Sequence, residues 1–351
     1  MVSWGVVAMV DEPAALLAAF AAHHLDLGAA KVHLCLDRPN DEAQDLLGVL
    51  PGVVLHADGE DGWAFRGQGR RPPKLNGRQK YHASRVLAQT RLDWLLHCDA
   101  DEFLQPPPGG ETIATLLARI EPAVNWVQVA VAERVFLRGR PAEDIFAGAF
   151  RLPWPGFAQE GGSVYGPEAM ALMQYGLCGH RMGKAMVRAG RGLFIGVHHG
   201  LASFSGAERD SAVVQGAGLR ILHFDGLTGL HYALKMLRYG LAERLDNPTK
   251  HAQARLAQIR AIAADAGAAE RLQALHAAVK TITPVQAQAL AARGLLRRWQ
   301  PEIAARVGRQ VSPAPDLRAQ AFDRALLERE AALVEMVRAR LGFDPAELVA
   351  K

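Results

Sequence analysis

Short apolar runs and longer stretches of helical periodicity alternate along the first hundred residues. The short runs are rich in β-branched and other apolar residues and predict buried strands at residues 6–10, 31–36, 53–56 and 94–98. The longer stretches predict helices at residues 14–27, 42–50 and 80–90. Pro13 suits the first turn of the first helix, and Gly28 suits its end. Strands separated by helices in this way predict parallel pairing with right-handed crossovers.

The rest of the chain changes character at about residue 230. Residues 59–76 are rich in Gly, Arg and Pro and predict an irregular segment. Residues 124–222 mix short strands with Gly- and Pro-rich loops, whereas residues from 230 onward are rich in Ala, Leu and Arg and predict helices. We therefore expect an α/β fold, with a mostly parallel sheet flanked by helices in residues 1–240 and an α-helical C-terminal extension in residues 241–351.

The composition limits the classes of protein that this sequence can encode. Half of the 351 residues are apolar and 22% are charged, which is enough apolar material for a sizeable core. No apolar stretch approaches the ~18 residues that span a bilayer, and the first residues lack the pattern of a secretory signal. Cys35, Cys98 and Cys178 form no CxxC pair, so we expect each to be a small buried residue. These features predict a soluble, cytoplasmic protein.

The net charge of +4 comes from the C-terminal part of the chain. Residues 251–351 hold 15 Lys and Arg against 10 Asp and Glu, whereas residues 1–250 hold 25 against 26. A nucleic-acid-binding protein more often interleaves basic residues with aromatics or shows a recognisable module, and neither pattern is evident. We therefore expect no nucleic-acid partner.

Carboxylates follow three of the predicted strands. Asp11 and Glu12 follow the first strand, Asp37 the second, and Asp99 and Asp101 the fourth. In open α/β sheets, ligands bind beyond the carboxyl ends of the strands. Two carboxylates at i and i+2 share one face of an extended chain, where they can point together at a divalent cation or a ribose. Such oxygen ligands suit Mg²⁺ or Mn²⁺ bridging substrate phosphates, although Asp is also common in ordinary turns.

Residues 99–104, Asp-Ala-Asp-Glu-Phe-Leu, resemble the Asp-x-Asp-Glu-Phe-Leu signature of family 2-like glycosyltransferases with a GT-A fold. The opening is also similar, with a strand, an acidic pair, a helix ending in His-x-x-x-Gly (His24 to Gly28) and a second strand closed by Asp37. Further similarities are Gln79-Lys80-Tyr81, Leu222-His223-Phe224 and Lys235. The resemblance covers roughly residues 4–240. Asp11 stands where the family usually has Asn, and Phe224 where Tyr is frequent, which leaves the nucleotide open.

This resemblance implies a metal-dependent, hexosyltransferase-type enzyme with a Rossmann-like GT-A domain. Such an enzyme moves a sugar, with inversion, from a nucleotide-sugar donor to the hydroxyl of a glycan, a lipid-linked acceptor or a protein. The resemblance implies that Asp101 and His223 hold Mn²⁺ or Mg²⁺, and that Asp99 contacts the ribose or supports the metal. It places Glu12 and Asp37 near the nucleoside.

A basic stretch precedes the fourth strand. Residues 66–85 contain seven Lys and Arg residues and no acidic residue. They could form a mobile loop that binds the diphosphate, with Arg78 and Lys80 as the best candidates, or a solvated surface loop.

The catalytic base and the reaction class stay open at the level of the sequence. An inverting transferase needs a carboxylate that deprotonates the acceptor hydroxyl, and Glu133, Asp144, Glu160 and Glu168 are all candidates. Glu160 and Glu168 flank a Gly-rich loop suited to an acceptor pocket. His198-His199 compete with His223 as a histidine donor. The alternatives to a transferase are a nucleotidyltransferase on a similar sheet and a non-catalytic protein that binds a sugar or nucleotide.

Overall fold

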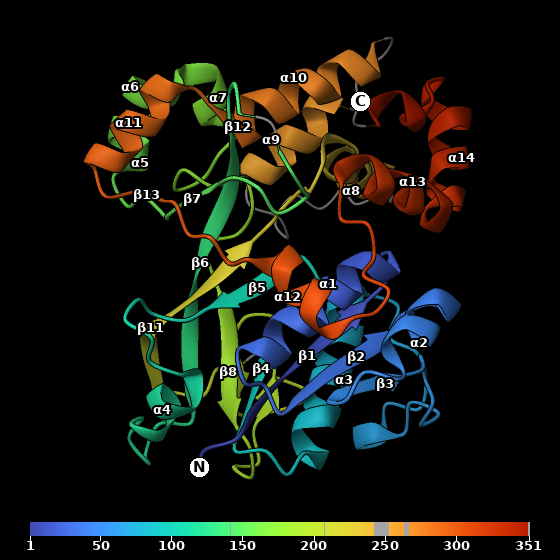
Figure 1. Cartoon of the computed structure of the whole chain (residues 1–351), viewed down its shortest axis with the longest axis vertical. Helices are drawn as coiled ribbons and strands as arrows, with labels where there is room; N and C mark the ends of the chain where they lie inside the picture. Colours follow the sequence, from blue (N-terminus) through green and yellow to red (C-terminus); the bar gives the residue numbers. More distant parts are fainter. Residues whose placement is uncertain (141, 207, 242–252, 263–266, 350–351) are drawn as a thin grey trace. The chain divides into compact units, whose positions relative to one another are not determined.

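The computed structural model describes residues 1–140, 142–206, 208–241, 253–262 and 267–349 (Figure 1). These residues belong to two compact units that alternate along the chain. Unit 1 comprises Met1–Val131, Met182–Leu222 and Glu302–Pro315. Unit 2 comprises Ala132–Arg181, His223–Pro301 and Asp316–Lys351.

Unit 1 has the α/β character that the apolar pattern predicts. Its elements are β1 (Trp4–Val10), α1 (Ala14–Asp26), β2 (Lys31–Leu36), α2 (Asp41–Leu47), β3 (Val53–His56), η1 (Phe65–Gly67), α3 (Leu75–Gln89), β4 (Trp94–His97), β5 (Glu102–Gln105), α4 (Ile113–Ala118), β8 (Lys184–Arg188), β9 (Phe194–Ile195), β10 (Gly200–Leu201) and α12 (Ile303–Gln310). Strands β6 (Trp126–Leu137) and β11 (Val213–His223) begin in unit 1 and end in unit 2.

The centre of unit 1 is a parallel sheet. β1 pairs in parallel with β2 and β4, and β2 pairs in parallel with β3, which gives the order β3-β2-β1-β4. β8 then pairs antiparallel with β4 and with the start of β6. The sheet of unit 1 is therefore mostly parallel, and it becomes antiparallel beyond β4.

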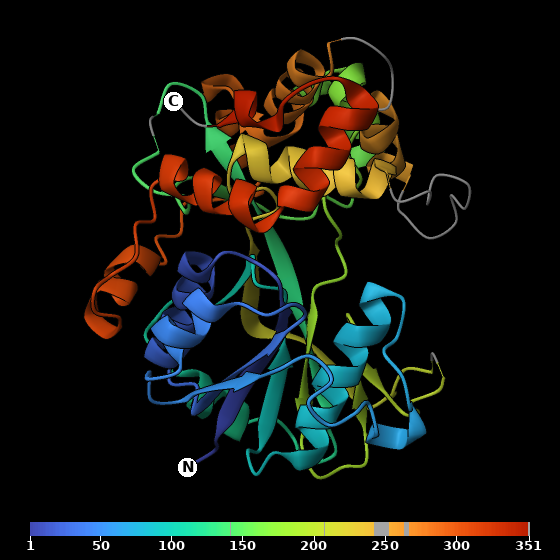
Figure 2. The ribbon, with the colours of Figure 1, turned by 90° about the vertical axis from the view of Figure 1, so that its right-hand side faces the viewer.

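Helices cover both faces of the parallel strands. Successive side chains of a strand point to opposite faces. Val7 and Met9 of β1 accordingly pack with Ala83 and Val86 of α3 in one buried cluster. Figure 2 shows α1 on the opposite face of the same strands. Leu16, Leu17 and Phe20 are among the apolar residues of α1 that are fully buried.

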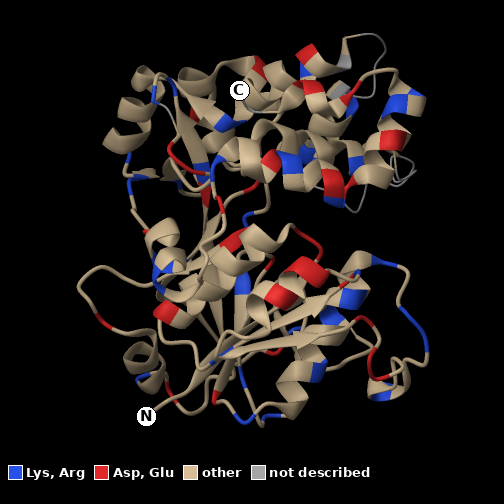
Figure 3. Ribbon diagram, turned by 45° about the vertical axis from the view of Figure 1, so that its right-hand side comes forward, with Lys and Arg blue, Asp and Glu red and all other residues tan. Residues whose placement is uncertain are grey.

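Unit 2 consists of helices and short strands. Its elements are β7 (Ala149–Arg151), α5 (Phe157–Glu160), α6 (Gly162–Tyr165), α7 (Pro167–Ala171), α8 (Gly229–Leu241), α9 (Gln253–Ile262), α10 (Ala268–Lys280), β12 (Thr281–Ile282), α11 (Pro284–Ala292), β13 (Leu296–Arg297), α13 (Ala319–Arg329), α14 (Ala331–Leu341) and η4 (Pro345–Leu348). Within this unit β7 pairs with β6 and β13, and β12 pairs in parallel with the end of β6. Acidic and basic positions are interspersed along its helices (Figure 3).

The predicted fold class is confirmed in its coarse form, as a mixed α/β fold with a mostly parallel sheet flanked by helices. The helix predicted from residue 80 begins earlier, at Leu75, so Arg78 and Lys80 lie within α3. The C-terminal region is mainly helical but also contains the short strands β12 and β13. The predicted domain boundary at residue 240 stays a prediction.

Two predictions from composition can be compared with the structure. Cys35, Cys98 and Cys178 are all buried free thiols, as predicted. In the part of the chain that the structure describes, every helix is too short or too polar to cross a membrane.

Candidate functional site

The carboxylates predicted at the strand ends lie along one edge of the parallel sheet in unit 1. β1 and β2 end in register, so Asp11 and Asp37 follow neighbouring strands at the same level. β4 pairs with the other side of β1 and leads through Cys98 into Asp99. This edge is where ligands bind in open α/β sheets. The predicted placement of these carboxylates is therefore confirmed.

Both carboxylate oxygens of Asp99 are engaged by side chains. Gln79 of α3 donates from Nε2 to Oδ1 at 2.6 Å. The ammonium of Lys184, at the start of β8, lies 2.7 Å from Oδ2 and also 2.9 Å from the Glu102 carboxylate. Burial opposes the charge on Lys184, but Asp99 and Glu102 outweigh this effect and raise its pKa above the usual value. Asp99 is thus held in one orientation.

Asp101 lies two residues further along the same loop and is 7% exposed. The loop is held in place by Glu102, which accepts a hydrogen bond from the backbone N–H of Asp99 at 2.9 Å. A carboxylate at a strand end is the kind of ligand that Mg²⁺ and Mn²⁺ take. The donor chemistry of Asp101 therefore fits the metal role that the resemblance implies.

Asp37 is paired with two arginines. Arg78 forms a bidentate pair, with 2.6 Å between Nε and Oδ1 and 2.7 Å between Nη2 and Oδ2. Arg71 lies 2.7 Å from Oδ1 and also pairs with Asp58 at 2.8 Å. The guanidinium of Arg78, the predicted diphosphate ligand, is thus directed to the carboxylate that is predicted to contact the nucleoside.

Glu12 and Lys80 lie in different surroundings. Glu12 is half-buried, and its carboxylate accepts from the backbone N–H of Asp11 at 2.7 Å. Asn40 donates to the backbone carbonyl of Glu12 at 3.1 Å. Lys80 lies 5.1 Å from the ring centroid of Phe204, and burial lowers its pKa. The structure therefore places Glu12 at the strand-end edge and directs Lys80 to an aromatic ring.

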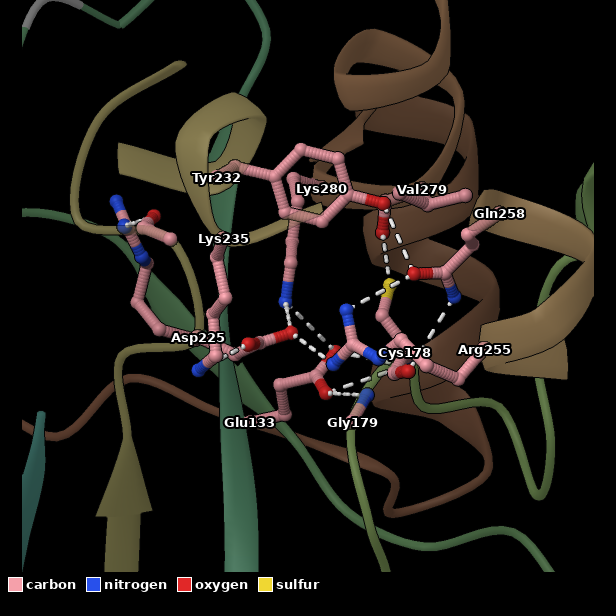
Figure 4. Close-up of polar contacts among 12 residues, drawn as sticks. Glu133, Cys178, Gly179, Asp225, Tyr232, Lys235, Arg255, Gln258, Val279 and Lys280 are labelled. Atoms are coloured by element: carbon pink, nitrogen blue, oxygen red, sulfur yellow. Dashed lines mark hydrogen bonds and ion pairs between the residues drawn. The ribbon is translucent and has the colours of Figure 1, made fainter. Parts of the chain in front are cut away.

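Unit 2 contains a second concentration of charge, in which the carboxylates are fully buried (Figure 4). Glu133 of β6 lies 2.5 Å from the guanidinium of Arg151 and 3.3 Å from the ammonium of Lys280. It also accepts hydrogen bonds from two consecutive backbone N–H groups, those of Cys178 at 3.0 Å and Gly179 at 2.6 Å. Glu133 therefore joins β6 to the segment before His180.

Asp225 is the other carboxylate of this network and pairs with three cations. Lys235 lies 2.8 Å from Oδ1, while Arg255 and Lys280 each lie 2.9 Å from Oδ2. Lys280 thus bridges Asp225 and Glu133. Gln258 accepts a hydrogen bond from the Tyr232 hydroxyl at 2.9 Å and extends the network.

The basic partners of both buried carboxylates of unit 2 lower the pKa of each and favour its ionised form. Burial alone would raise the pKa of Glu133, but Lys280 and Arg151 lower it well below the usual value. Burial is likewise outweighed at Asp225, where Arg255, Lys235 and Lys280 lower the pKa. A carboxylate that strongly prefers its ionised form is a weak proton acceptor. Glu133, one of the candidates for the base, therefore fits a structural role better.

Two of the remaining candidates for the base, Glu160 and Glu168, lie on short helices of unit 2 and are exposed. Glu160 ends α5, and its carboxylate lies 3.8 Å from Arg293. Glu168 lies in the first turn of α7. Asp144 is half-buried and accepts from the backbone N–H of Phe146 at 2.7 Å.

The histidines named from the sequence lie in different units. His223 ends β11 and is 4% exposed. Its ring stacks on that of His180, with 5.2 Å between the ring centroids and 29° between the planes. In unit 1, His198 contacts the Gly183 carbonyl at 2.9 Å and His199 contacts the Gln128 side chain at 3.2 Å. His198 and His199 thus have structural contacts within unit 1.

Sequence reasoning missed the residues that hold these carboxylates in place. They are basic residues from segments distant along the chain: Lys184, Arg151, Arg255 and Lys280. Lys184 and Lys280 are fully buried, which is rare for lysine without an acidic partner. The available signal was the position of Lys184 and Arg151 within short apolar strand sequences, Lys184-Ala-Met-Val and Ala-Phe-Arg151.

The sequence was also compared with known proteins. It matches no family model and no curated protein.

Proposed function

We propose that this protein is a metal-dependent glycosyltransferase of the GT-A type, which transfers a sugar from a nucleotide-sugar donor to an acceptor hydroxyl with inversion. One observation carries the proposal. The Asp99-Ala100-Asp101 loop follows β4 at the carboxyl edge of a parallel sheet. Glu12 follows β1, which pairs with β4, and Asp37 follows β2, which pairs with the other side of β1. A nucleotide that binds across that edge would meet carboxylates from three strands.

The proposed roles follow from how each side chain is held. Asp101 would ligate a divalent cation, which when bound offsets the negative charge that develops on the leaving diphosphate. Asp99 is fixed by Gln79 and Lys184, which favours a supporting or ribose-contacting role over direct ligation. Glu12 and Asp37 would contact the nucleoside. His223 is the further ligand that the resemblance implies.

The proposed reaction is a single displacement. The acceptor oxygen bonds to the anomeric carbon, the bond from that carbon to the phosphate oxygen breaks, and its electron pair leaves with the diphosphate. The proton of the acceptor hydroxyl passes to a carboxylate base. Glu160 and Glu168 remain the candidates, because each is exposed and neither belongs to the buried network.

Nucleotide binding tests the donor site directly. Melting temperature and calorimetry are measured with UDP, GDP, CDP and ADP, with and without Mn²⁺. A ligand that binds the native state raises the melting temperature according to its concentration relative to Kd. We expect one nucleoside diphosphate to stabilise the protein only with Mn²⁺, and Asp101→Asn to abolish this effect.

The control variant is Asp45→Asn, which changes an exposed carboxylate on α2 and should bind like the native protein. A folded native protein that responds to no nucleotide overturns the donor site. Release of pyrophosphate from a nucleoside triphosphate and a sugar phosphate would instead indicate a nucleotidyltransferase. Nucleotide binding without release of nucleoside diphosphate from any nucleotide sugar would indicate a binding protein.

A further inference from the structure

The stacked pair His180–His223 brings two imidazoles together inside unit 2. Their ring centroids are 5.2 Å apart, and their nitrogen ligand atoms lie within 4.8 Å of one another. His223 is buried and His180 is half-buried. Imidazole nitrogen is a ligand that suits first-row transition metals. This pair is therefore a possible donor set for one cation.

The backbone before His180 is held by Glu133. Its carboxylate accepts from the N–H groups of Cys178 and Gly179, and it is anchored in turn by Arg151 and Lys280. A Cβ atom at Gly179 would lie 3.0 Å from Glu133 Oε2 and 3.1 Å from His223 Cε1. Glycine at this position allows the backbone, the carboxylate and the His223 ring to pack closely. Metal sites regularly contain groups that do not bind the metal but hold its ligands in position.

Asp225 also lies within reach of His223, with ligand atoms within 4.8 Å. Its two oxygens, however, are paired with Lys235 on one side and with Arg255 and Lys280 on the other. A metal ion that binds Asp225 would have to compete with these three basic side chains for the carboxylate oxygens. Asp225 is therefore better suited to fix the chain after His223 than to bind a metal.

We propose that His180 and His223 bind one divalent cation through one nitrogen each, and that Glu133 and Asp225 position them. This assigns His180 as a metal ligand and makes the site selective for Mn²⁺ over Mg²⁺, because Mg²⁺ prefers oxygen ligands. The role of the cation in sugar transfer rests on the function proposed above. The two-histidine site itself stands on the geometry of unit 2.

The test uses Mn²⁺ alone on the full chain. Pulsed electron paramagnetic resonance detects the couplings between bound Mn²⁺ and the nuclei of its ligands, and labelling histidine with ¹⁵N identifies imidazole. We expect couplings to two histidine nitrogens in the native protein and to one in His180→Gln. We also expect the ratio of Mn²⁺ to Mg²⁺ affinity to fall at least tenfold in His180→Gln.

The matched control is His231→Gln, which replaces another half-buried histidine of unit 2 and should keep both couplings. Because the native protein alone reports the number of nitrogens, the result does not depend on the folding of His180→Gln. Bound Mn²⁺ with one or no histidine coupling, or no Mn²⁺ binding, overturns the inference. Two couplings without a nucleotide response would leave the inference intact and overturn the proposed function.

Discussion

The ammonium of Lys184 lies 2.7 Å from the carboxylate of Asp99, although the Lys184 side chain is fully buried. A buried cation is tolerated when it is paired, and removing one member leaves the other charge uncompensated. Lys184 also neutralises Glu102, which is itself fully buried. One lysine on β8 therefore holds both ends of the loop that contains the Asp-x-Asp motif.

Replacing this lysine should destabilise the protein. We expect Lys184→Met to lower the free energy of unfolding by about 3 kcal/mol, because Glu102 loses its buried counter-charge. Adding Glu102→Gln should restore at least about 1 kcal/mol of that loss by removing the unpaired charge. Urea unfolding measures both effects. Lys31→Met, at an exposed position of β2, is the control and should change little. Equal unfolding midpoints for native protein and Lys184→Met would contradict this role.

The two arginines of Asp37 should differ in their contribution to stability. The Arg78 side chain is 11% exposed and forms a bidentate pair, whereas the Arg71 side chain is 42% exposed. Solvent weakens exposed ion pairs, which contribute up to about 1 kcal/mol. We expect Arg78→Gln to lower the free energy of unfolding by about 2 kcal/mol and Arg71→Gln by less than about 1 kcal/mol. Similar losses in the two variants would show that the bidentate geometry contributes nothing extra.

The buried imidazole of His24 should make stability depend on pH. Its Nδ1 lies 2.8 Å from the Phe20 carbonyl, while Nε2 accepts from the backbone N–H of Leu104 at 3.3 Å. Burial lowers its pKa from 6.5 to about 4, against the hydrogen bond to Phe20, which raises it. Between these two pH values the unfolded chain binds a proton that the folded protein excludes. The contribution of His24 to the free energy of unfolding is thus fully present above pH 6.5 and is lost toward pH 4, by up to about 3 kcal/mol.

Unfolding free energies measured from pH 7 to pH 4 test this dependence. His24→Gln should flatten the decline by up to about 1.4 kcal/mol per pH unit, because one proton is no longer linked to unfolding. Leu17→Ala removes a fully buried side chain from the same helix and should reduce stability equally at every pH. An unchanged slope in His24→Gln would mean that His24 is not a source of the pH dependence.

Features of this structure that depend on residues close together in the sequence can be predicted, whereas contacts between distant segments cannot. Strands β2 and β3 have the predicted bounds, because each apolar run lies between polar turns that are visible in the sequence itself. The strand-end position of Asp99 follows from the same local pattern. The partners of Asp99 do not, because Gln79 and Lys184 come from α3 and β8 and meet it only after the chain has folded.

The buried network of unit 2 shows the same limit. Glu133, Asp225 and Lys280 are separated by many residues, and each alone resembles an ordinary surface charge in the sequence. These side chains can be buried because they form ion pairs with one another, and the sequence around each of them does not indicate this pairing. From the sequence, Glu133 is therefore one of several equivalent candidates for a base, whereas the structure places it in the core of an ion-pair network.

Gly179 links the stability of unit 2 to the proposed histidine site. Because a Cβ atom there would approach both Glu133 and His223, Gly179→Ala should displace one of them and lower the free energy of unfolding by about 1–3 kcal/mol. It should also weaken Mn²⁺ binding at least tenfold, since His223 is a proposed ligand and Glu133 holds the backbone before the other ligand, His180. Gly162→Ala is the matched control, because its Cβ would meet only Met170 Sδ, at 3.8 Å, within the described residues. A destabilised Gly179→Ala that keeps native Mn²⁺ affinity would separate the packing of this glycine from metal binding and count against the proposed histidine site.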